Sequence, residues 1–174
     1  MLSRMATQPG NEKASNDILQ RMSKNAKETM DKMGDIVWMI KPGESEGNSL
    51  KQRMERFAYE ICSSKNISTT INLEDLEKIK FTMQQRKNIY LIFKEAMNNA
   101  VKYSGTSQIN ITAWLQNNRI QLQVKDLGTG FNTAIIKKGN GLDNMQYRAK
   151  ELGAEIDIES GDEKGTAIIL KIPV

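Results

Sequence analysis

Apolar residues recur every three or four positions over residues 12–41, and this spacing is the period of an α-helix. The stripe is narrow, as in a seam between two or four packed helices rather than in a helix that covers a globular core. The breakers Lys41-Pro42-Gly43 end the helix, so we expect a linker over residues 42–49. The apolar positions of the stripe are Ile18, Met22, Ala26, Met30, Met33, Val37 and Ile40.

The rest of the chain, residues 50–174, switches between helical and strand periods. Helices are predicted from near Ser49, from Thr82 to about Ser104, and from about Gly139 to a stop at Gly153. Strict alternation predicts strands over residues 66–73, in QINITAWL and RIQLQV, and in a final hairpin formed by AEIDIES and TAIILKI. The order predicts an α+β fold: a two-layer α/β sandwich with a mixed, mostly antiparallel sheet and helices on one face.

Composition narrows the classes of function. Of 174 residues, 39% are apolar and 26% charged, and no apolar run approaches the length of a membrane span. The single cysteine, Cys62, fits a reducing compartment. The chain has no histidine, which excludes Ser-His and Cys-His catalysis and most zinc sites. The net charge of +4 comes from lysines scattered over helix faces, so we expect no nucleic-acid partner.

Three polar residues form a stripe on the helix predicted to start at Thr82. At about 100° per residue, Glu95, Asn99 and Lys102 lie together beside the apolar face, whereas Asn98 points further toward water. A carboxylate, an amide oxygen and an ammonium suit a hydrated Mg²⁺ and a polyphosphate. An ordinary polar contact four residues apart, with a solvated lysine, is the alternative. The residues expected to face the sheet are Ile89, Ile92, Phe93, Ala96 and Ala100.

Two glycine clusters follow the strand RIQLQV. In Asp126-Leu127-Gly128-Thr129-Gly130, the carboxylate at the strand end can accept a hydrogen bond from an exocyclic amine such as that of adenine. We expect Gly128 and Gly130 to turn the backbone with positive φ and to approach a flat ring. In Gly139-Asn140-Gly141-Leu142, a helix begins after two lysines, which favours an anion. An ordinary turn and a glycine N-cap remain the alternatives.

The order of these pieces resembles the ATP-binding domain shared by bacterial sensor histidine kinases, gyrase, MutL and the large heat-shock chaperones, known as the Bergerat fold. EAMNNAVKYS matches its N box, DLGTG its G1 box, GNGLDNMQYRA its G2 box and GTAIILKIP its terminal strand. The resemblance covers roughly residues 50–174 and implies the cofactors ATP and Mg²⁺.

The resemblance also implies roles for the polar stripe. Asn99 would be the Mg²⁺ ligand and a catalytic residue, with Glu95 as its catalytic helper, ordering metal-bound water. Lys102 would contact phosphate. Tyr103 stands where related kinases commonly carry histidine, and the helical phase turns it toward the core. We therefore expect Tyr103 to pack at the cofactor pocket rather than to ligate metal.

For the rest of the pocket, the resemblance implies that Asp126 binds the adenine amino group and that Thr166 lies near the adenine. The glycines would shape the pocket and its lid. The remaining cofactor-binding residues are then Gly128, Gly130, Lys138, Gly139, Gly141 and Leu142.

The front of the chain is similar to another part of the same kinases. KETMDKMGDIVWMIKP resembles their second dimerisation helix and linker, and Leu2-Ser3-Arg4 is similar to the residues just after their phosphoacceptor histidine. This implies a fragment cut after that histidine. Residues 1–41 would be a partial dimerisation and phosphotransfer region with a long dimerisation helix, 42–49 a linker, and 50–174 the ATP-binding domain.

The implied function is transfer of the γ-phosphoryl of Mg-ATP to a histidine upstream of this fragment, for relay to an aspartate of a response regulator. The implied partners are a receiver domain and a second copy of the chain through residues 12–41, and the fragment alone would not autophosphorylate. It would be the cytoplasmic portion of a membrane-anchored sensor, with membrane contact only through missing upstream regions. The alternatives are an anti-sigma-factor-like nucleotide switch and, from the basic charge, a nucleic-acid binder.

Overall fold

The structure is a computed structural model that describes residues 12–40, 49–131, 140–162 and 164–174 of the chain. It contains two compact units, residues 1–43 and 44–174. In the first unit, helix α2 (Glu12–Ile40) exposes Met30, Met33 and Val37 to solvent. The expected linker, apart from Ser49, and Leu2-Ser3-Arg4 lie outside the described residues. Across the described part of the chain, every helix is too short or too polar to span a bilayer.

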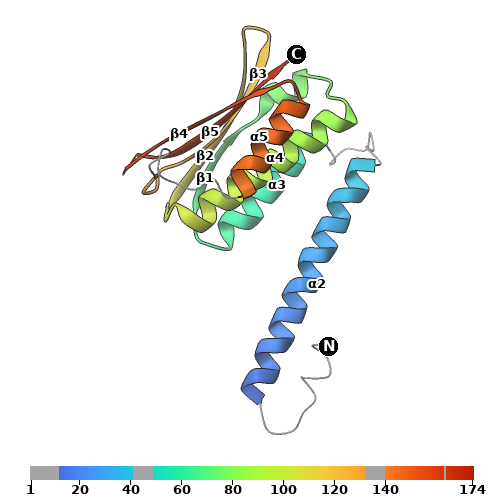
Figure 1. Ribbon diagram of the computed structural model, residues 1–174, viewed down its shortest axis with the longest axis vertical. Helices are drawn as coiled ribbons and strands as arrows, with labels where there is room; N and C mark the ends of the chain where they lie inside the picture. The colour runs from blue at the N-terminus through green and yellow to red at the C-terminus, as the bar shows by residue number, and fades with distance from the viewer. Residues whose placement is uncertain (1–11, 41–48, 132–139, 163) are drawn as a thin grey trace. The chain divides into compact units, whose positions relative to one another are not determined.

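The second unit is a two-layer α+β sandwich, as the sequence predicts, with its helices packed on one face of a five-stranded sheet (Figure 1). The sheet order is β1-β2-β3-β5-β4, with β1 parallel to β2 and every other pair antiparallel. The helices are α3 (Leu50–Ser63), η1 (Glu74–Lys78, a 3-10 helix), α4 (Met83–Tyr103) and α5 (Asn140–Glu151). The strands are β1 (Ser68–Asn72), β2 (Gln108–Gln116), β3 (Arg119–Asp126), β4 (Glu155–Gly161) and β5 (Gly165–Pro173).

The core lies between the sheet and α4. The apolar arc of α4 that was expected to face the sheet is buried along its whole length. Alternate residues of each central strand pack on the helix side of the sheet, because successive side chains of a strand point to opposite faces. Each fully buried Leu, Ile or Phe contributes about 1.5–3 kcal/mol. The largest of these sheet residues are Ile109, Ile111, Ile120, Leu170 and Ile172.

Local signals fix the helix ends. Thr82 caps α4: its hydroxyl accepts the Gln85 amide at 3.2 Å, and the Gln85 side chain accepts the Thr82 amide at 2.9 Å. At the end of α5, Gly153 takes φ +61° and the Ala154 amide donates to the Ala149 carbonyl at 2.9 Å, which is a Schellman ending. Capping residues therefore fix where α4 begins and where α5 ends.

The β2–β3 turn sets the sheet register. Asn117 and Asn118 have φ of 51° and 56°, the left-handed pair that matches the twist of a two-residue hairpin. From this turn, pairing runs from Gln116 opposite Arg119 to Ile109 opposite Asp126. The register of the hairpin thus places Asp126 at the end of the sheet, beside the last turn of α4.

The sequence patterns missed the 3-10 helix η1. Its Asp75 accepts the backbone amide of Leu115 at 2.9 Å and pairs with Lys78 at 2.6 Å. Asp75 therefore provides an acceptor for a β2 amide that lies beyond the end of the β1–β2 pairing. The segment has no apolar period of its own, so the pattern of the sequence did not predict this helix.

Candidate functional site

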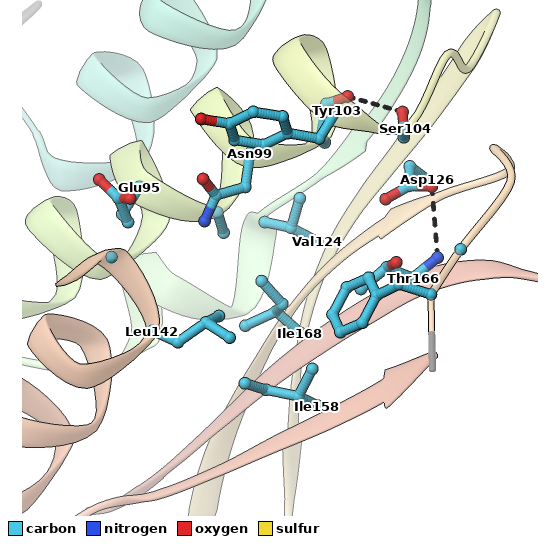
Figure 2. Close-up of a pocket in the computed structure, with 15 residues that line it drawn as sticks. Glu95, Asn99, Tyr103, Ser104, Val124, Asp126, Leu142, Ile158, Thr166 and Ile168 are labelled. Atoms are coloured by element: carbon cyan, nitrogen blue, oxygen red, sulfur yellow. Dashed lines mark hydrogen bonds between the residues drawn. The ribbon is translucent and has the colours of Figure 1, made fainter. Parts of the chain in front are cut away.

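A cavity of about 510 Å³ opens between α4, the start of α5 and the inner face of β3, β4 and β5 (Figure 2). Its sheet wall and much of its helix wall are apolar. Polar groups stand at the edges: Glu95 and Asn99 on α4, Asp126 at the end of β3, and Thr166 at the start of β5. The apolar lining residues are Ala96, Ala100, Val124, Phe131, Leu142, Ile158 and Ile168.

On the α4 wall, Glu95 and Asn99 are one helical turn apart, half-buried, and both line the cavity. Asn98 is also half-buried but does not line it. Lys102 is exposed and likewise outside the lining. The structure therefore brings together the carboxylate and the amide of the predicted stripe, and leaves its lysine in solvent.

Asp126 is buried beneath this wall, with 4% of its surface exposed. Its Oδ1 accepts the backbone amides of Gly128 at 3.0 Å and Thr166 at 3.2 Å. Burial raises the pKa of the Asp126 carboxyl, and the two backbone hydrogen bonds act in the opposite direction. Within the described part of the chain, Oδ2 takes no such bond, so one acceptor oxygen remains for a ligand.

Close backbone packing around Asp126 requires glycine. A Cβ at Gly128 would overlap the carbonyl oxygen of Ser104, and the expected positive φ at Gly128 is wrong. Gly130 does take a positive φ, +65°, and a Cβ there would overlap the Gly161 carbonyl oxygen. Gly165, at φ +71°, packs in the same way against the Asp126 carbonyl. Residues 127–131 after β3 are therefore packed closely against Ser104, just past α4, and against the β4–β5 hairpin.

Gly141 also allows close packing, here between α4 and α5. A Cβ at Gly141 would overlap Oε1 of Glu95, so its absence lets the first turn of α5 lie directly on the α4 stripe. Leu142, the next residue, lines the cavity. Lys138 and Gly139, predicted to precede this turn, lie outside the described residues.

Tyr103 is not packed into the core, and that expectation is wrong. The residue is 76% exposed, although it does line the cavity, where its ring lies near Asn99 (Figure 2). Tyr103 is the last residue of α4, so no further helical turn covers its outer side. A helical wheel gives a direction around the axis but not the point along it where the neighbouring layer stops.

Sequence reasoning left several residues of the site unassigned, including the lining residues Ser104, Val124, Ile158 and Ile168. Phe131 lines the cavity, and a sequence signal existed because it directly follows the glycine cluster. Ser160 and Gly165 contribute through backbone and hydroxyl contacts that no periodicity reveals. Among the described residues, no group of three or more His, Cys, Asp or Glu side chains is placed to hold a metal ion.

Comparisons with known proteins place this chain in a family. The family model described as histidine kinase-, DNA gyrase B-, and HSP90-like ATPase matches residues 84–174. Sensor histidine kinase LiaS of Bacillus subtilis is 27% identical over 150 residues, 86% of this chain and 41% of that protein. The histidine-protein kinase/phosphatase UhpB of Salmonella typhimurium is 22% identical over 174 residues, 99% of this chain and 34% of that protein. The chain thus spans less than half the length of these relatives.

Solved structures show the same fold. The histidine kinase domain of the Erythrobacter litoralis EL346 blue-light activated kinase aligns with a TM-score of 0.63 at 17% identity, covering 75% of this chain and 65% of that one. Acinetobacter baumannii histidine kinase AdeS aligns with a TM-score of 0.62 at 14% identity, covering 95% of this chain and 86% of that one.

The packing of Gly165 can be tested against a glycine with similar backbone strain. Gly105 has φ +64° with open space around it, so Gly105→Ala should cost about 1–2 kcal/mol of unfolding free energy from strain alone. Gly165→Ala adds overlap with the Asp126 carbonyl and should cost a further 1–3 kcal/mol or so. Urea denaturation of both variants measures the difference. Equal losses would show that the β5 start is not packed on Asp126 as described.

Proposed function

This chain belongs to the histidine kinase-, DNA gyrase B- and HSP90-like ATPase family, and from that premise we propose that it is the catalytic ATP-binding region of a two-component sensor histidine kinase. The observation that carries the proposal is the buried Asp126 at the end of an apolar cavity whose helix wall bears Glu95 and Asn99. That combination suits a flat apolar base at one end and a metal-bound polyphosphate at the other.

The base end of the cavity suits adenine. Oδ2 of Asp126 is an acceptor for an exocyclic amino group, and Thr166 lines the cavity next to it. Apolar side chains of β3, β4 and β5 form the floor on which a purine ring would lie. Guanine carries a carbonyl oxygen where adenine carries its amine, so a carboxylate acceptor favours adenine.

The phosphate end offers two oxygen-bearing side chains that suit Mg²⁺. Asn99 offers an amide oxygen as a metal ligand, and Glu95 a carboxylate that orders metal-bound water. The metal would neutralise charge on the phosphates during transfer. Lys102, Lys138 and the glycines at 139 and 141 are the further proposed phosphate and lid contacts. No covalent chemistry by the protein is needed, because positioning and charge neutralisation carry the reaction.

The acceptor of the phosphoryl group is a histidine upstream of this fragment, and the product is relayed to an aspartate of a receiver domain. The histidine kinase names of the relatives support this step. Exposed Met30, Met33 and Val37 on α2 support pairing of two chains through residues 12–41. In this arrangement 1–41 is the partial dimerisation region, 42–49 the linker and 50–174 the catalytic domain, within the cytoplasmic portion of a membrane-anchored sensor.

The two asparagines of α4 provide the first test. Asn99→Ala should abolish Mg²⁺-dependent ATP binding, because Asn99 supplies the proposed metal ligand. Asn98→Ala is the matched control and should change affinity and stability by no more than about 0.5 kcal/mol, since Asn98 does not line the cavity. Calorimetric titration with and without Mg²⁺ measures both. Similar losses in the two variants would remove Asn99 from the metal site.

Asp126→Asn should separate nucleotide binding from folding. The amide keeps an Oδ1 acceptor for Gly128 and Thr166, but ATP should bind about 1.5–3 kcal/mol more weakly while GTP changes less. The pKa of Asp126 is raised in the folded chain, so the contribution of Asp126 to the free energy of unfolding should fall as pH rises from the unfolded-state pKa through the folded one. The variant should lack that fall, as urea denaturation across this pH window would show. Unchanged ATP affinity in a folded variant would exclude Asp126 from the base site.

The missing histidine gives the third test. Incubated with labelled ATP, the present chain should bind nucleotide but incorporate no acid-labile, alkali-stable phosphate, because it contains no imidazole. A longer chain that restores the upstream residues through the acceptor histidine should become labelled, and Asn99→Ala in that chain should prevent it. Acid-labile phosphate on the present chain would contradict the proposal.

A further inference from the structure

The hydroxyl of Ser160 lies at the junction of three site segments. It accepts the backbone amide of Phe131 at 2.9 Å, contacts Oγ1 of Thr166 at 2.8 Å, and donates to the carbonyl of Gly165 at 3.2 Å. Ser160 and Thr166 are directly paired across β4 and β5. Ser160 itself does not line the cavity, whereas Phe131 and Thr166 do.

Either oxygen of the Ser160–Thr166 pair could donate by distance alone, and counting hydrogens indicates one direction. A serine hydroxyl has one proton and two lone pairs. The Phe131 amide uses one lone pair, and the contact with the Gly165 carbonyl requires the Ser160 proton, since a carbonyl can only accept. The Thr166 proton must then point to the second lone pair of Ser160. The reverse direction would leave two oxygens facing each other at 3.2 Å with no proton between them.

This direction decides what Thr166 offers to a ligand. With its proton used on Ser160, Oγ1 of Thr166, a residue that lines the cavity, is left as an acceptor only. Asp126, whose Oδ1 is held by the Thr166 amide, adds the acceptor Oδ2. The base end of the cavity therefore presents two acceptors, which suits an amino group and opposes a carbonyl oxygen.

We propose that Ser160 is a positioning residue that holds Thr166 as a hydrogen-bond acceptor and thereby sets a preference for 6-amino over 6-oxo purine nucleotides. This inference rests on the proposed function, because it assumes that the purine occupies the Asp126 end of the cavity. Removing the Ser160 hydroxyl frees the Thr166 proton, and Thr166 can then donate to a carbonyl oxygen on the base.

The test compares Mg-ATP with Mg-ITP, which carries a carbonyl oxygen in place of the adenine amine, by calorimetric titration of the full chain. Ser160→Ala should lower ATP affinity roughly three- to tenfold and ITP affinity less, so the ATP/ITP affinity ratio falls. Ser160→Thr keeps the hydroxyl and should keep the ratio. Glu159→Ala, an exposed neighbour on the same strand, is the matched control and should change neither affinity.

Circular dichroism establishes that each variant is folded. If Ser160→Ala does not fold, Ser160→Cys retains the size with a weaker donor and should also lower the ratio. An unchanged ratio in the folded variant overturns the inference, even where both affinities fall, because the hydroxyl would then only anchor the loop. Failure of the wild-type chain to bind either nucleotide would instead contradict the proposed function.

Discussion

The buried carboxylate of Asp126 holds the site together through two backbone amides. Gly128 donates from the loop after β3 and Thr166 from the start of β5, so one oxygen joins two segments that are far apart in sequence. A buried carboxylate without such partners would be costly, and burial still raises its pKa. The close approach that these bonds need leaves no room for a Cβ at Gly128 or Gly165. The carboxylate that we propose as the acceptor for a purine amine thus also joins the segments that form the cavity.

Docking of α5 on α4 forms the other half of the site, and it is fixed at both ends. At one end, Gly141 lets the first turn of α5 lie on Glu95. At the other end, the fully buried Asn88 of α4 donates to Glu151 at 3.2 Å and accepts from Arg148 at 3.3 Å. Buried polar groups of this kind specify one register, because any slip would leave them without partners. The position of Leu142 in the cavity therefore depends on contacts well away from it.

Much of the fold could be predicted because its signals are local. The helical stripe of α4, the Thr82 cap, the Asn117-Asn118 turn and the alternation of the strands each depend on residues a few positions apart. The same local signals predicted that Glu95 lies beside Asn99 and that Asp126 lies at a strand end. Lys102 was expected on the site stripe and Tyr103 toward the core, but Lys102 lies outside the cavity lining and Tyr103 is mostly exposed, since periodicity says nothing of where a neighbouring layer ends.

The α+β class, the order of the elements and the polar groups that could meet a nucleotide can be predicted from the sequence, because period, caps and turn residues act over short range. Three features become visible only in the folded chain: the parallel pairing of β1 with β2, the packing of Gly128 on the Ser104 carbonyl, and the link from Phe131 to Thr166 through Ser160. Most of these contacts join residues that are far apart in sequence, such as Ser68 of β1 and Gln108 of β2, and they form only when the sheet and helices close on a common core.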